Sequence, residues 1–323
     1  MRFGKMIRAL VFAVLASALV YAVMVALSDG PAVLDAFARI PAALVVLLVG
    51  MSTAAYVARG LRWGWLMRRL GYPVSTRDAL YLHFAGQTMS VSPARVGEVL
   101  KPWLAREVTG MPMSVGIALV FCERVADLIA VCILALGALS LVGGDIWVLV
   151  ASLIAVMAGT ALASSEWFHR VVLRVLSRQA WARHHQEALA SMSETVRTSL
   201  AWRTLLLAVP VSVFAWGLEG VGLWLLVREA APGALGPWAT VSVYAVATLV
   251  GAFSFLPAGI GLTEASLAGV LVASGLHPSA AAASTLVIRV TTLWWSVACG
   301  WLALGTRPAL SRRLFGRAAP EEE

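Results

Sequence analysis

Long apolar runs constrain this chain more than any other feature, because a helix needs about 20 apolar residues to cross the roughly 30 Å hydrocarbon core of a bilayer. Six stretches are predicted to span a membrane: 7–27, 41–58, 113–142, 145–164, 204–227 and 280–305. Hydrophobic residues make up 60% of the chain and charged residues only 13%, whereas soluble domains are about 25% charged. The sequence therefore predicts an all-α integral membrane protein and excludes a soluble enzyme, a disordered chain and a disulfide scaffold.

Two further apolar segments, 79–104 and 239–275, are interrupted at Ser90–Glu98 and at Phe255–Glu264. Proline removes a backbone donor, so neither segment is expected to cross the membrane as one regular helix. Lipid cannot satisfy the freed backbone groups, so an irregular tip at membrane depth must be covered by protein or must line a cavity. Both segments are therefore predicted to be re-entrant helical hairpins.

The two halves of the chain share a repeat. The sequence PARVG at Pro93–Gly97 returns as PAGIG at Pro257–Gly261. A stretch from glycine to tryptophan precedes each tip (Gly60–Trp63 and Gly220–Trp224), and an Arg-Val pair follows each tip at 124–125 and 289–290. We expect a single transmembrane domain, 1–323, that contains a first unit at 41–142, a basic cytoplasmic linker at 165–203 and a second unit at 204–305. In the predicted topology the hairpins enter from opposite sides, so the units form an inverted repeat, a design that recurs in membrane transporters.

The distribution of basic residues supports this layout. The formal net charge is +8, which in a membrane protein indicates cytoplasmic loops and anionic lipid surfaces rather than nucleic acid. With six spans, only Arg39 and Arg228 fall on one side, and Arg95, Arg124 and Arg289 lie at membrane depth. Every other Lys and Arg falls on the opposite side. We therefore expect cytoplasmic N- and C-termini in a multi-pass protein of the bacterial inner membrane.

The linker 165–203 has two interpretations. Arg170, Arg174 and Arg178 recur at i, i+4 spacing beside apolar neighbours, which is typical of a basic amphipathic helix on the anionic lipids of the inner leaflet. A basic loop that only enforces topology fits the sequence equally well.

Several charged residues lie within the predicted membrane region, where each costs at least about 2.5–3.5 kcal/mol at a helix centre. They are Glu123, Arg124 and Asp127 in the span 113–142, Glu219 and Arg289 in the last two spans, Arg95, Glu98 and Glu264 at the hairpin tips, and Lys101 beyond the first tip. Structural pairing is one explanation: Arg124 with Asp127 at i, i+3, and Arg289 with Glu264 or Glu219. Ligand binding is the other, because arginine suits phosphate and carboxylates suit a cationic headgroup or a coupled proton.

Together these residues resemble the flippase-like transmembrane region of the lysylphosphatidylglycerol synthases and its stand-alone relatives. The resemblance rests on Pro93–Glu98 followed by Lys101-Pro102, on Glu123–Asp127, on Phe255–Glu264, on Arg289 and on Arg59–Trp63. It implies an inner-membrane helical bundle with two re-entrant hairpins that moves a phospholipid, a hopanoid or a polyprenyl-linked headgroup between leaflets. The chain ends at Glu323, which leaves no room for the aminoacyl transferase domain of the bifunctional members, so synthase activity is not expected.

We therefore expect a lipid translocase whose partners are membrane lipids. The residues expected to bind the headgroup are Arg95, Glu98, Lys101, Glu123, Arg124, Asp127, Glu264 and Arg289, with Arg62, Pro93, Gly97, Glu219, Pro257, Gly259 and Gly261 in supporting positions. Two alternatives stay open: a proton-coupled carrier of a small soluble solute, and a non-transporting membrane factor that recruits an enzyme.

Enzyme activity is not expected, because the sequence contains no recognisable nucleophile and base set and no metal-ligand cluster. No cofactor and no metal are expected for the same reason. His83 and His277 flank the two hairpin tips and are interpreted as interfacial side chains.

Overall fold

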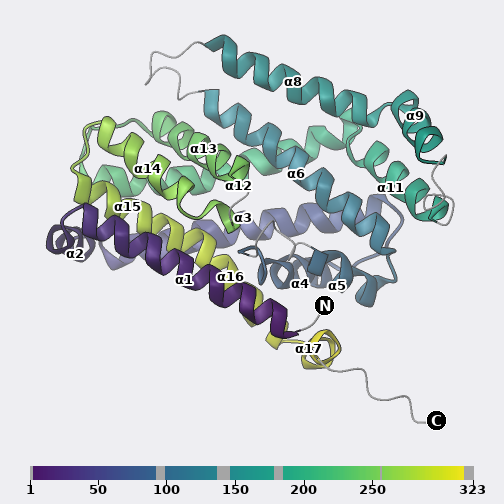
Figure 1. Ribbon diagram of the computed structural model, residues 1–323, viewed down its shortest axis with the longest axis horizontal. Coiled ribbons are helices and arrows are strands. Elements are labelled where there is room, and N and C mark those ends of the chain that lie inside the picture. The colour runs from purple at the N-terminus through teal and green to yellow at the C-terminus, as the bar shows by residue number, and fades with distance from the viewer. Residues whose placement is uncertain (1–2, 92–98, 137–145, 178–184, 255–256, 316–323) are drawn as a thin grey trace.

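The computed structural model describes residues 3–91, 99–136, 146–177, 185–254 and 257–315, and every regular element in these ranges is a helix (Figure 1). In chain order they are α1 (Phe3–Leu27), α2 (Gly30–Ala38), α3 (Ala42–Arg69), α4 (Thr76–Gln87), α5 (Leu100–Thr109), α6 (Met113–Ala135), α8 (Ile146–Ser164), α9 (Glu166–Leu176), α11 (Gln186–Ser199), α12 (Trp202–Ala230), α13 (Pro237–Phe253), η3 (Pro257–Gly259), α14 (Leu262–Ala273), α15 (Pro278–Arg289), the π-helix η4 (Val290–Trp294), α16 (Trp295–Gly305) and α17 (Pro308–Phe315). The predicted all-helical class is confirmed.

Within the described residues, three helices are long and apolar enough to cross a membrane: α3, α12 and the continuous stretch Pro278–Gly305 formed by α15, η4 and α16. A fourth crossing results if α1 and α2 count as one span, although the two helices meet at an angle of 103°. α8, α13 and α14 contribute shorter apolar helices. α6 is also apolar, but it differs from these spans in carrying three charged residues, Glu123, Arg124 and Asp127, near its centre. The fold is that of a multi-pass membrane protein.

Some of the helices differ from the expected ones. α3 continues past residue 58 to Arg69, and Arg68 and Arg69 in its last turn suit the negative end of the helix dipole. α6 ends at Ala135, and residues 137–142 of the predicted span lie outside the described residues. α2 was not expected; Asp29 has a φ of 64°, and its side chain accepts from the amide of Ala32. This turn starts a nine-residue helix that is too short to stand out from the apolar run before it.

Each predicted hairpin segment contains two short helices: α4 and α5 in the first, α13 and α14 in the second. Ser75 begins α4, because its Oγ accepts from the amide of Asp78 at 3.0 Å. Gly110 ends α5 with a φ of 74°, which a glycine adopts without strain. Pro237 and Pro278 lie in the first turns of α13 and α15, where a missing backbone donor is harmless.

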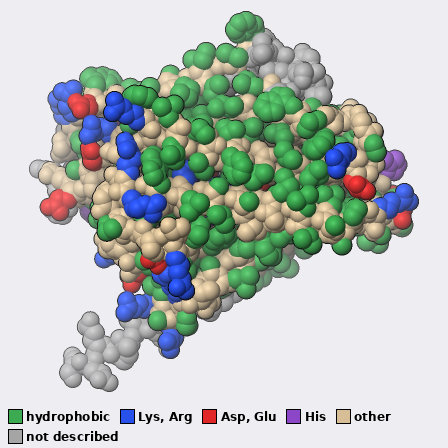
Figure 2. Space-filling view, turned by 180° about the vertical axis from the view of Figure 1, so that it is seen from behind, with side chains coloured by type: hydrophobic (Ala, Val, Ile, Leu, Met, Phe, Trp, Pro, Cys, Tyr) green, Lys and Arg blue, Asp and Glu red, His purple; other side chains and the backbone are tan. Residues whose placement is uncertain are grey.

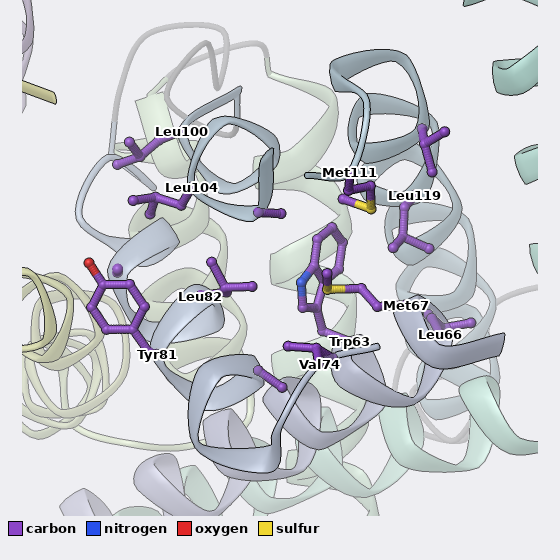
Figure 3. Packing of buried hydrophobic residues seen from close by; sticks show 14 of the residues in the cluster. Trp63, Leu66, Met67, Val74, Tyr81, Leu82, Leu100, Leu104, Met111 and Leu119 are labelled. Carbon is purple, nitrogen blue, oxygen red and sulfur yellow. The ribbon is translucent and has the colours of Figure 1, made fainter. Parts of the chain in front are cut away.

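Each hairpin segment packs into its own apolar core. The buried indole of Trp63 on α3 lies among Met67 on the same helix, Leu82 on α4, Met111 before α6 and Leu119 on α6 (Figure 3). A second core holds α13 and α14 against α12 and α15 through residues that include Leu223, Leu226, Tyr244, Leu267 and Ile288. α6 contacts both segments, because its Val131 and Leu134 also pack against Val241 and Ala245 of α13.

Two groups of short helices and helix ends lie toward opposite ends of the molecule's long axis. Figure 1 shows α9, α11, α17 and the start of α1 toward one end, and α2 with the connection between α14 and α15 at the other. The spanning helices carry exposed apolar side chains such as Leu15, Val46 and Leu302. Figure 2 shows the apolar groups across the middle of one face, with Lys and Arg mostly toward its ends. Such a surface suits lipid around the middle and water at both ends.

Candidate functional site

Residues from both hairpin segments line one cavity of about 140 Å³. α4 contributes His83 and Gln87, and the second segment contributes Thr248 and Thr263. The charged residues on the cavity wall are Arg59, Arg62, Glu123, Arg124, Asp127, Glu219 and Arg289. Charged groups from α3, α6, α12 and α15 therefore meet at one place in the molecule.

Arg62 on α3 is the centre of the largest ion network. Its Nη2 lies 3.3 Å from Glu123 Oε1, and its Nη1 lies 3.0 Å from Asp127 Oδ1. Ser212 on α12 accepts from the same Nη1 and donates to Asp127 Oδ1 at 2.8 Å. Arg62 is only 3% exposed. Since a buried charge is stable only with partners, this network ties α3, α6 and α12 together.

Lys101 joins this network from the first hairpin segment. Its Nζ donates to Glu123 Oε2 at 2.6 Å and lies 3.4 Å from Nδ1 of His83. The same ammonium lies 3.6 Å from the centre of the Trp63 ring, where the ring electrons attract a cation. Glu123 and Asp127 stand one turn apart on α6, so one helix face presents both carboxylates to Arg62 and Lys101.

A second network joins α3 to α12 and α13. Arg59 Nη1 donates to Glu219 Oε1 at 2.8 Å, and the hydroxyl of Tyr244 donates to Glu219 Oε2 at 2.8 Å. The Arg59 guanidinium also lies over the ring of Trp216, 4.4 Å from its centroid. Stacking and pairing together fix the plane of this guanidinium beside the cavity.

Arg289 secures the tip of the second hairpin segment. Its Nε donates to Glu264 Oε1 at 2.6 Å, and its Nη2 donates to the carbonyl of Ala258 at 3.1 Å. Glu264 Oε2 accepts from the amide of Gly261 at 2.7 Å and thereby caps the start of α14. Ala258, Gly259 and Gly261 all have positive φ, at 50°, 69° and 96°, a conformation that favours glycine. One ion pair thus holds an irregular backbone turn.

Most of the expected site residues meet here. Glu123, Arg124, Asp127 and Arg289 line the cavity, while Lys101 and Glu264 are the ion-pair partners of Glu123 and Arg289. Pro257 and Gly259 form the short helix at the second tip. Pro93, Arg95, Gly97 and Glu98 lie outside the described residues.

Both pairings expected from the sequence are present, and for Arg289 the structure selects Glu264 from the two alternatives. Arg124 Nη1 lies 3.5 Å from Asp127 Oδ2, and Arg289 pairs with Glu264. Glu219 pairs with Arg59 rather than with Arg289.

Sequence reasoning missed several side chains of the site: Arg59, Ser212, Trp216 and Tyr244. The interfacial interpretation of His83 was wrong, because His83 is only 5% exposed and lines the cavity. The sequence repeat contained a signal for the ion pair between Arg59 and Glu219, since these two residues directly precede the matching glycines Gly60 and Gly220.

Comparison with known proteins covers the whole of this site. A family model described as the lysylphosphatidylglycerol synthase TM region matches residues 10–300. Two UPF0104 membrane proteins of Methanothermobacter thermautotrophicus (strain Delta H) are similar to the chain. One is 27% identical over 279 residues, which are 79% of this chain and 80% of the relative. The other is 23% identical over 297 residues, which are 84% of this chain and 87% of the relative.

Proposed function

We propose that this chain, which belongs to the lysylphosphatidylglycerol synthase TM region family, is a lipid translocase that carries a phospholipid or lipid-linked headgroup between leaflets. One observation carries the proposal: buried arginines and carboxylates of α3, α6, α12 and α15 surround a cavity whose wall also includes polar side chains of both hairpin segments. Each such charge is costly in a membrane, and a purely structural bundle does not need to gather them around an open space.

The architecture that goes with this function is six spanning helices and two re-entrant hairpins in an inverted repeat. Matched contacts support the repeat. A Cβ on Gly60 would lie 2.9 Å from Leu80 of α4, and a Cβ on Gly220 would lie 2.9 Å from Val241 of α13, so each glycine admits the first helix of its hairpin segment. The second helix of each segment then pairs with the helix that follows.

That second contact has reversed polarity in the two units. In the first, the cation Lys101 on α5 pairs with the carboxylate Glu123 on α6 at 2.6 Å. In the second, the carboxylate Glu264 on α14 pairs with the cation Arg289 on α15, also at 2.6 Å. Two similar units that face the cavity from opposite directions are the arrangement by which repeat-built transporters expose one site alternately to two sides.

The proposed location is the cytoplasmic membrane, with both termini in the cytoplasm. The grouping of α9, α11, α17 and the start of α1 at one end of the molecule supports this topology. On the exposed side of α9, Trp167 and Val175 accompany Arg170 and Arg174. This mixture suits contact with anionic lipids of the inner leaflet.

In the proposed cycle the headgroup crosses through the cavity while its acyl chains stay in the bilayer. Arg124 and Arg289 line the path, and Glu123, Asp127 and Glu264 hold the cations in place. Arg95 and Glu98 keep the roles that the sequence predicts for them, at the first tip.

Transport in liposomes provides the test. The purified chain is reconstituted with a fluorescent phospholipid, and the fraction that becomes accessible to an external quencher is followed over time. Arg124→Gln and Glu264→Gln should each lower the transport rate at least tenfold, while Arg228→Gln, an exposed arginine far along α12, should not. Thermal unfolding and gel filtration identify any variant that has not folded. Undiminished lipid transport in both folded variants contradicts the proposal, and transport of a soluble solute without lipid favours the carrier alternative.

A further inference from the structure

Every carboxylate oxygen of the described charge networks already has a partner. The carboxylate of Glu123 accepts from Arg62 and Lys101. The carboxylate of Asp127 accepts from Arg62 and Ser212 and forms an ion pair with Arg124. The carboxylate of Glu219 accepts from Arg59 and Tyr244, and that of Glu264 accepts from Arg289 and from the amide of Gly261. Within the part of the chain that the structure describes, a cationic headgroup entering the cavity would find no free carboxylate.

The nitrogen atoms show the opposite pattern. Among the described residues of the cavity wall, Arg59 Nε, Arg59 Nη2, Arg62 Nε, His83 Nε2 and Trp216 Nε1 are buried without a hydrogen-bond partner. Since Nδ1 of His83 faces the Lys101 ammonium, which can only donate, Nε2 of His83 carries the ring proton and is a donor too. Buried donors without acceptors are rare in folded proteins, so this cluster indicates an acceptor-rich ligand.

The net charge of the described networks also favours an anionic ligand. The described networks contain five cations, Arg59, Arg62, Lys101, Arg124 and Arg289, against the four carboxylates Glu123, Asp127, Glu219 and Glu264. The surplus of one positive charge is neutralised by one singly charged anion. A phosphodiester carries one negative charge and only acceptor oxygens on its phosphate, and a cavity of about 140 Å³ admits a headgroup but not acyl chains.

We propose that the cavity selects a phosphodiester headgroup that has no cationic group, and that Arg59, His83 and Trp216 donate to its oxygens. This inference rests on the proposed function and narrows its substrate class to anionic diester lipids such as phosphatidylglycerol. Arg59 is the specificity-determining residue, because Glu219 occupies its Nη1 and leaves Nε and Nη2 without an acceptor in the wall of the cavity.

Binding is measured by thermal unfolding of the purified full chain in detergent. The probes are dihexanoyl phosphatidylglycerol, dihexanoyl phosphatidylcholine and inorganic phosphate. The first has the diester alone, the second adds a quaternary ammonium, and the third distinguishes a free anion from a lipid headgroup. Phosphatidylglycerol should stabilise the chain at lower concentration than either of the others. Equal or better stabilisation by phosphatidylcholine overturns the proposal, and so does stabilisation by inorganic phosphate alone.

The variants remove donors while they keep the fold. Arg59→Lys keeps a cation beside Glu219 but removes the two unpaired nitrogens Nε and Nη2, and Trp216→Phe keeps a ring under residue 59 but removes the indole donor. Each should weaken phosphatidylglycerol binding about tenfold, as expected for the loss of a hydrogen bond to a charged group. Arg228 stacks on Trp224 in the same way, 5.0 Å from its ring centroid, so Arg228→Lys and Trp224→Phe are matched controls that should bind as the native chain does. Unchanged binding in folded Arg59→Lys contradicts the assignment.

A transport assay with labelled phosphatidylglycerol and phosphatidylcholine separates this inference from the proposed function. Selective binding without any lipid transport supports the site and contradicts the translocase. Equal transport of both lipids supports the translocase and contradicts the selectivity.

Discussion

Arg62 contacts two helices that are distant from it in the sequence, which shows how this molecule solves the problem of a charge in the membrane. Its guanidinium reaches Glu123 and Asp127 on α6 and Ser212 on α12. Removing one member of such a buried set costs about 3–5 kcal/mol because the other charges lose their partner. The arginine therefore acts both as a link between helices and as part of the cavity wall.

Single glycines allow close contact between helix backbones. Gly300 on α16 provides a prediction. A Cβ at this position would lie 2.5 Å from the amide nitrogen and 2.8 Å from Cα of Thr88, at the end of α4. Since backbone atoms cannot move aside, Gly300→Ala should destabilise the fold by about 1–3 kcal/mol. Gly217→Ala is the control, because nothing lies within 4 Å of a Cβ there, and it should be neutral or slightly stabilising. Thermal unfolding in detergent gives both values, and equal melting temperatures for the two variants would contradict the contact.

For the helices and hairpin segments, features set by neighbouring residues could be predicted from the sequence better than contacts between distant residues. The proline and glycine residues that interrupt 79–104 and 239–275 correctly indicated pairs of short helices, because their effect on the backbone is local. Arg124–Asp127 was predictable from i, i+3 spacing for the same reason. The partner of Glu219 was not, since Arg59 lies 160 residues away and only the packing of α3 on α12 brings the two together. α2 was missed because its start depends on one turn at Asp29.

The contact between the first turn of α4 and Arg307, between α16 and α17, gives a prediction on pH. Asp78 in the first turn of α4 accepts from Ser75 and from Arg307. The Ser75 hydroxyl first, and then Arg307, hold the pKa of Asp78 below its usual value. A carboxyl with a lowered pKa binds fewer protons when folded, so it stabilises the fold above its unfolded pKa of about 3.9. This stabilisation is lost as the pH falls through the pKa of the folded state.

Asp78→Asn should therefore lower the melting temperature at pH 7 by an amount that corresponds to no more than about 1 kcal/mol, because the pair is partly exposed. The difference from the native chain should shrink as the pH falls below about 4. Melting curves of both proteins across this range check it, and Arg307→Gln should remove part of the same pH dependence. A difference that stays constant from pH 7 to pH 3 would contradict the role given to this pair.

At the scale of the whole molecule, the proposed inversion makes equivalent loops face opposite sides of the membrane. Pro73 precedes the first hairpin segment and Pro232 precedes the second, and both residues are exposed. The positive-inside rule assigns the first loop to the cytoplasm and the second to the outside. An ordinary duplication, with both units in the same orientation, would expose both loops on one side.

Cysteine labelling distinguishes these two topologies. The chain contains three cysteines, Cys122, Cys132 and Cys299, and their replacement gives a background that should not react with a maleimide. In that background Pro232→Cys should react with a membrane-impermeant maleimide in intact cells. Pro73→Cys should react only after the membrane is permeabilised. Because the two positions are equivalent in the repeat and both are exposed, a difference between them reports the side of the membrane rather than burial. Labelling of both variants in intact cells would show that the units are parallel, and alternating access by two inverted units would then be untenable for this chain.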